Sequence, residues 1–173
     1  EDDSLAVRFI IGHYLASVYF RDVVFVSDLL SEIFPKDDPR KKDIYLATWE
    51  GYLSNTIYDK LFILLKDYYL HAVKLDPSSY TIRKYSKGLD ESLATHLALA
   101  FVYLGLEMSD TLFQEFWRVN NTTRHKEFVS FIGRTYLQRD RAEQEDPEKN
   151  NKIKEKLLGF WSWTLKEIPD VNV

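Results

Sequence analysis

The chain has 173 residues, which is enough for one domain with a substantial hydrophobic core. It contains no cysteine, and this excludes disulfides and thiolate metal sites. Its formal net charge is −4, with acidic and basic residues interspersed, which argues against a general affinity for phosphate backbones. Aromatic residues are abundant while Gly and Pro are scarce, a composition that is compatible with helices.

Apolar residues recur with the period of an α-helix along most of the chain, and no stretch shows the sustained alternation of a strand. This pattern places Ile10, Tyr14 and Val18 on the apolar side of the first helix. Asn121 and Thr122 suit a helix N-cap. We therefore predict an all-α protein with eight helices, at about 4–20, 22–34, 40–54, 56–75, 89–107, 110–119, 121–139 and 152–167, and a solvated loop or frayed helix end at 140–151.

The fifth predicted helix, 89–107, is the most apolar of the eight. Every residue from Leu97 to Leu106 is apolar except Tyr103 and Gly105. A helix that is apolar on all sides is packed on several sides, and ten such residues are too few for a bilayer, which needs about 20. We expect a buried central helix and no membrane segment.

The two halves of the sequence resemble each other. SDLLSEIF (27–34) matches SDTLFQEF (109–116), and RKKDI (40–44) matches RHKEF (124–128). The spacing is 82 to 84 residues, and it increases to 96 where Lys60-Leu61 matches Lys156-Leu157.

This self-similarity predicts that one helical domain, 1–173, contains two tandem four-helix units. The first unit is 4–75, the linker is 76–88 and the second unit is 89–168. Each unit would hold two hairpins of about 40 residues, the length of HEAT/armadillo repeats, and such arrays have exposed end faces unless they are capped. A single closed helical bundle is the alternative.

The sequence carries no pattern of catalytic chemistry. It has no H-E-x-x-H, no Gly-rich phosphate loop and no G-x-S-x-G, so we expect no metal, no cofactor and no enzymatic activity. A small enzyme with a buried carboxylate pair is the remaining catalytic alternative. His13 and His96 occupy equivalent positions in the two halves, and we expect each to have a packing role with one hydrogen bond.

Two groups of residues are candidates for contact with a partner. Tyr80, Arg83, Lys84 and Tyr85 mix aromatic rings and cations in the linker, which suits a protein contact or a single-stranded nucleic acid as well as a plain linker. Trp161 and Trp163 are two residues apart, so on one helix they point about 200° apart. One of them is expected to reach an edge of the array or a partner.

A basic ridge is a third candidate. Arg40 and Lys41 are echoed by Arg124 and Lys126 at the starts of the third and seventh predicted helices. Bases at a helix start oppose the helix dipole, so an acidic neighbour or an acidic partner is expected there. A solvated surface is the plain explanation of the ridge, and binding of nucleic acid through it is the alternative function.

Three strings carry a resemblance to a known class of proteins. They are ATWEGYL (47–53), FVSFIGRTYL (128–137) and LLGFWSWTLKE (157–167). The chain resembles the helical-repeat, HEAT-like regions of large multidomain prokaryotic proteins that carry an NTPase or sirtuin-like effector domain and are associated with antiviral defence. In such proteins the repeats act as a sensor or scaffold, and the chemistry lies elsewhere in the chain.

Together these features predict a non-catalytic helical scaffold or recognition module that binds another protein or another domain of its parent chain. The chain starts at an acidic Glu1 with no leader pattern, so we expect an excised part of a longer cytoplasmic protein.

Overall fold

The structure is a computed structural model that describes residues 4–76, 88–138 and 147–167. All regular structure within these residues is helical, and the predicted all-α class with eight helices is confirmed. The α-helices are α1 (Leu5–Arg21), α2 (Val23–Ile33), α3 (Lys42–Leu53), α4 (Asp59–Lys74), α5 (Leu89–Tyr103), α6 (Thr111–Arg118), α7 (Thr122–Gln138) and α8 (Pro147–Glu167). A short 3₁₀ helix, η1 (Pro39–Lys41), leads into α3.

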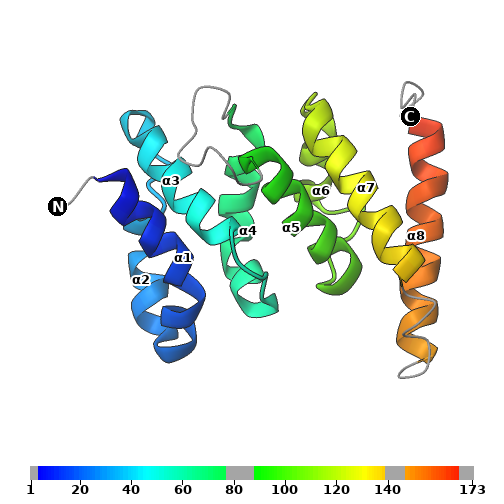
Figure 1. Ribbon diagram of the computed structural model, residues 1–173, viewed down its shortest axis with the longest axis horizontal. Coiled ribbons are helices and arrows are strands. Elements are labelled where there is room, and N and C mark those ends of the chain that lie inside the picture. The colour runs from blue at the N-terminus through cyan, green and yellow to red at the C-terminus, as the bar shows by residue number, and fades with distance from the viewer. Residues whose placement is uncertain (1–3, 77–87, 139–146, 168–173) are drawn as a thin grey trace.

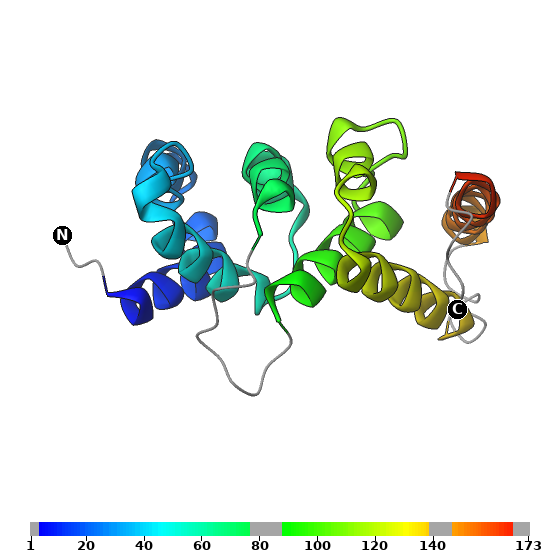
Figure 2. The ribbon, with the colours of Figure 1, turned by 90° about the horizontal axis from the view of Figure 1, so that it is seen from above.

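The helices lie in two layers. Helices α1, α3, α5 and α7 form one layer and run side by side in the same direction, while α2, α4, α6 and α8 form the other (Figures 1 and 2). Contacts within a layer link α1 with α3, α3 with α5, α5 with α7, and α4 with α6. The molecule is therefore elongated, with α1 and α2 at one end and α7 and α8 at the other.

The tightest helix pair, α1 with α3, depends on two glycines. A Cβ on Gly12 would overlap the carbonyl oxygen of Thr48, and a Cβ on Gly51 would overlap the carbonyl oxygen of Phe9. These neighbours are backbone atoms, which cannot rotate away as a flexible side chain can. Glycine at both positions lets the two backbones touch.

Helix ends follow local chemistry. The backbone amide of Arg124 donates to the Asn121 side chain over 3.0 Å, which confirms the predicted cap of α7. Helix α5 ends at Tyr103, four residues before the predicted end. Gly105 there adopts a left-handed φ of 75°, and the amide of Leu106 donates back to the carbonyl of Ala100.

The prediction of a loop or frayed helix end at 140–151 was wrong for its last five residues. Helix α8 already begins at Pro147, where proline suits a first helical turn.

The core is one continuous apolar cluster between the two layers. Helix α5 lies in its middle and contacts α3, α4, α7 and α8, so the prediction that this helix is packed on several sides is confirmed. Leu93, Leu97 and Phe101 are buried on it. Helix α1 lies at the end of the molecule and buries only part of its apolar side.

Candidate interaction surfaces

The linker candidates Tyr80, Arg83, Lys84 and Tyr85 lie outside the described residues. The tryptophan pair lies within them. Trp163 packs into an aromatic cluster, with its ring centroid 5.7 Å from that of Phe113 and 5.4 Å from that of Trp117.

Trp161 is half-buried and has a ring neighbour in Phe160 at 5.5 Å. It shares one side of α8 with Leu158 and Leu165, at the helical spacing i, i+3, i+7. These two leucines are 54% and 82% exposed. The outer side of α8 is thus an apolar stripe at the end of the molecule.

One member of the predicted basic ridge, Arg124, is not accessible to a phosphate. Arg124 is 2% exposed, and its guanidinium donates to Asp90 over 2.6 Å and to the carbonyls of Val73 and Leu75. The planar, five-donor guanidinium can satisfy several acceptors at once, so it joins α7 to the C-terminal end of α4 and to the start of α5. Arg124 as a nucleic-acid contact is therefore incorrect.

The other members of the ridge remain at the surface. Arg40 is exposed, and its Nε lies 3.0 Å from Asp38, the residue that caps η1. The hydrogen bond from Arg40 lowers the pKa of Asp38. This carboxylate is the acidic neighbour that a base at a helix start was expected to need. Lys126 is exposed, and Lys41 is half-buried.

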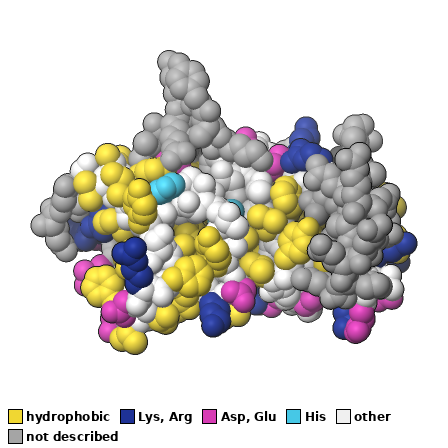
Figure 3. Space-filling model, turned by 60° about the horizontal axis from the view of Figure 1, so that its bottom comes forward, with side chains coloured by type: hydrophobic (Ala, Val, Ile, Leu, Met, Phe, Trp, Pro, Cys, Tyr) yellow, Lys and Arg dark blue, Asp and Glu magenta, His cyan; other side chains and the backbone are white. Residues whose placement is uncertain are grey.

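An apolar groove lies between α1 and α2 and has a volume of about 460 Å³. Ile10 and Tyr14 line it and are 53% and 56% exposed. Its other lining residues are Arg8, Ile11, Leu15, Val18, Phe25, Val26, Leu29, Glu32 and Ile33. In Figure 3, hydrophobic side chains gather over this N-terminal end of the molecule, at the left of the view.

This groove was missed as a site in the sequence, although its residues were placed on an apolar helix side. The signal that identifies it is the comparison of the two halves. Ile10 and Tyr14 match Leu93 and Leu97, 83 residues later, which are 3% and 1% exposed. Apolar residues that match in the sequence are thus covered in the middle of the molecule and exposed at its end.

The histidines that were predicted to pack are joined by Asn55. Its side chain donates to the carbonyl of His13 over 2.8 Å, and its own carbonyl accepts from Nε2 of His96 over 2.9 Å. The other ring nitrogen of His96, Nδ1, lies 2.8 Å from the hydroxyl of Tyr69, which lies 3.2 Å from that of Tyr52. His96 thus makes two hydrogen bonds rather than one.

Burial lowers the pKa of His96 to about 4 and raises the pKa of Tyr69. The imidazole is therefore neutral at pH 7. Because the carbonyl of Asn55 can only accept, Nε2 carries the proton and Nδ1 accepts from Tyr69. The network holds α1, the α3–α4 connection, α4 and α5 together without exposing a reactive group.

Other kinds of site are not found among the described residues. Nowhere in them do three or more His, Asp or Glu side chains gather as metal ligands would. None of the helices in that part of the chain combines the length and the apolar character that crossing a bilayer requires. No protein-family model, no curated protein and no solved structure matches this chain.

Proposed function

We propose that this protein is a non-catalytic helical scaffold or recognition module that binds another protein, or another domain of its parent chain, through the apolar groove between α1 and α2. One observation carries the proposal. Ile10 and Tyr14 are more than half exposed, whereas Leu93 and Leu97, which match them in the second half, are covered by neighbouring helices. A cytoplasmic location belongs to the same proposal.

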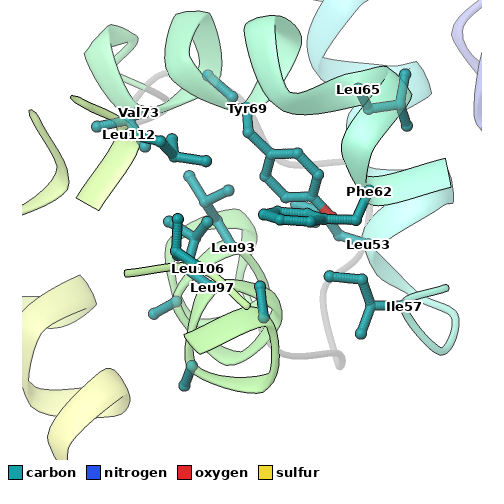
Figure 4. Packing of buried hydrophobic residues seen from close by; sticks show 14 of the residues in the cluster. Leu53, Ile57, Phe62, Leu65, Tyr69, Val73, Leu93, Leu97, Leu106 and Leu112 are labelled. Carbon is teal, nitrogen blue, oxygen red and sulfur yellow. The ribbon is translucent and has the colours of Figure 1, made fainter. Parts of the chain in front are cut away.

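The covered positions indicate what kind of partner fits. Leu93 lines a small cavity together with residues of the preceding helices, namely Leu46, Trp49, Leu53, Ala72 and Leu75. On α4, Phe62, Tyr69 and Val73 form a buried stripe that faces Leu93 and Leu97 (Figure 4). An amphipathic helix that presents such a stripe is thus the occupant with the right chemistry.

Burial of apolar side chains would drive such a contact. Burial of one large apolar side chain stabilises a complex by roughly 1.5–3 kcal/mol before the entropy of association is subtracted. The groove offers Ile10, Tyr14, Val18 and Phe25, each at least one-third exposed. A partner would bury the part of these side chains that is still exposed.

Binding of nucleic acid, the other function considered, gains no support from the described residues. Arg124 is buried in an ion pair, and Arg40 is paired with Asp38. The net charge of −4 opposes it as well.

The test is binding of a fluorescent peptide that reproduces α4, residues 59–74. A hydrocarbon staple between positions 63 and 67, both exposed on α4, keeps this short helix folded. We expect saturable binding, measured by fluorescence anisotropy, and a loss of at least about tenfold in affinity in the Ile10→Glu and Tyr14→Glu variants.

The matched control is Ile63→Glu in the protein, because Ile63 is also exposed but lies outside the groove. This variant is expected to bind as the wild type does. A control peptide carrying Phe62→Asp and Tyr69→Asp should not bind. Equal binding by the Ile10→Glu and Ile63→Glu variants, or no binding of the α4 peptide to the wild type, would contradict the proposal.

A further inference from the structure

The exposed stripe on α8 has a buried counterpart within the same molecule. Lys156-Leu157 matches Lys60-Leu61 at a spacing of 96 residues. At the same spacing, Leu158 matches Phe62 and Leu165 matches Tyr69 in the sequence. Phe62 and Tyr69 are fully buried, whereas Leu158 and Leu165 are exposed. The exposed residues on the outer side of α8 thus match the buried residues on the side of α4 that faces α5.

The junction between the two halves shows what this side of α4 binds. Phe62 and Tyr69 point toward Leu93 and Leu97 of α5 (Figure 4). The hydroxyl of Tyr69 lies 2.8 Å from Nδ1 of His96 on the same helix. Leu93 and Leu97 are the positions that Ile10 and Tyr14 match at the other end of the molecule. The exposed stripe on α8 therefore matches the residues that α4 contributes to the junction. The exposed residues on α1 match those that α5 contributes.

We propose that two copies of this chain associate head to tail, with the α8 stripe of one copy seated in the α1–α2 groove of the next. This inference rests on the proposed function, and it names a second copy as the partner. The two surfaces are different, so the contact is heterologous and each added copy leaves a free end for another. Association would extend the two layers of helices from copy to copy.

Charge is compatible with this contact. At the internal junction, Nζ of Lys66 lies 2.8 Å from the carboxylate of Asp110. By the same spacings of 96 and 82 residues, Lys66 corresponds to Ser162 and Asp110 corresponds to Asp28, and both of these side chains are exposed. In the contact between two copies, the hydroxyl of Ser162 would therefore face the carboxylate of Asp28. This pair brings no like charges together.

The experiment is sedimentation velocity on the wild type and on two variants that each block one end. Tyr14→Glu places a charge in the α1–α2 groove, and Leu165→Glu places one in the α8 stripe. Both side chains are exposed, so these substitutions leave the core intact. Each variant alone keeps one good end but lacks a matching surface. An equimolar mixture restores one contact, between the α8 stripe of the Tyr14→Glu variant and the groove of the Leu165→Glu variant.

We expect the wild type to form a concentration-dependent series of species, each variant alone to be a monomer, and the mixture to stop at a 1:1 dimer. Ile63→Glu is the control and should behave as the wild type does. A wild type that stays monomeric at several hundred micromolar would overturn the inference. Variants that each still dimerise alone would also overturn it, because they would indicate a symmetric contact.

The two proposals fail in different ways. If the α4 peptide binds in the groove but the protein remains a monomer, the recognition module stands and the second copy is not its partner. If the peptide does not bind and no association occurs, both proposals fail.

Discussion

At the scale of single residues, His96 shows how a polar group is accommodated in this core. The side chain is buried, and its two ring nitrogens have partners in Asn55 and Tyr69. The repeat position predicted a packing role, and that role is confirmed. The partners could not be predicted, because Asn55 and Tyr69 reach His96 only once the chain has folded around α5.

This burial makes the stability of the protein depend on pH. The pKa of His96 is about 4 in the folded state and about 6.5 in the unfolded state, so the unfolded chain binds more protons between these values. The free energy of unfolding should therefore fall as the pH is lowered from about 6.5 to about 4, by up to roughly 3 kcal/mol from this residue. Urea titrations at successive pH values measure it.

His71 and His125 contribute in the same direction, since burial lowers the pKa of both. The His96→Gln variant isolates the contribution of His96, because glutamine does not titrate. It should be less stable than the wild type at pH 7 but show a clearly shallower dependence on pH. An identical pH dependence in the variant and the wild type would contradict the assignment to His96.

The burial of Arg124 could not be predicted from the sequence. Its place at a helix start beside Lys126 suggested a solvated base or a phosphate contact. The Arg124 side chain is buried because it donates to the backbone carbonyls of Val73 and Leu75. These carbonyls lie at the C-terminal end of α4, where the helix itself supplies no donors. No sequence pattern indicates that the end of one helix will meet the start of another.

Removal of the Arg124 side chain should strongly destabilise the protein. Arg124→Ala removes the cation paired with Asp90, which keeps only the hydrogen bond from the Asn121 amide, and it removes the donor of two carbonyls. We expect a loss of roughly 3–5 kcal/mol in the free energy of unfolding. Lys126→Ala, two residues away and exposed, should change stability by less than about 0.5 kcal/mol. Chemical denaturation of both variants compares them directly, and similar stabilities would refute the structural role of Arg124.

At the scale of elements, the period of apolar residues was sufficient to predict eight helices in the correct order. It could not predict where α5 ends, because the left-handed turn at Gly105 is a local event within an apolar run. It also could not tell which apolar side is covered. Periodicity shows that Ile10 and Tyr14 share a side of α1, but only the arrangement of the other helices shows that this side is open.

The packing of α1 on α3 gives a test at this scale. Gly12→Ala should destabilise the protein by about 3 kcal/mol, since the new methyl group overlaps the backbone of Thr48 and must push the two helices apart. Gly133→Ala in α7 is the matched control, because a Cβ there has nothing within 4 Å. It should stabilise the protein by roughly 0.5–1 kcal/mol through helix propensity. Thermal unfolding of both variants measures the difference, and a neutral Gly12→Ala would show that α1 and α3 are not in backbone contact.

At the scale of the whole molecule, the two ends are the features that call for explanation. The middle of the molecule covers Phe62 and Tyr69 on α4 and Leu93 and Leu97 on α5, and the ends expose residues at the matching positions. The sequence predicted exposed end faces for an array of helices. It did not predict the complementarity that we propose for the two ends, because that proposal depends on which sides meet at the internal junction.

Site-specific cross-linking tests this complementarity most directly. The chain has no cysteine, so Tyr14→Cys and Leu165→Cys each introduce a single thiol. The two variants are mixed in equal amounts with a short bismaleimide and resolved by mass spectrometry. The head-to-tail contact predicts that cross-links between positions 14 and 165 predominate, and that they disappear when Ile10→Glu is added to the Tyr14→Cys chain. Predominant 14–14 or 165–165 cross-links, or no cross-linking above the level of an Ile63→Cys control, would contradict it.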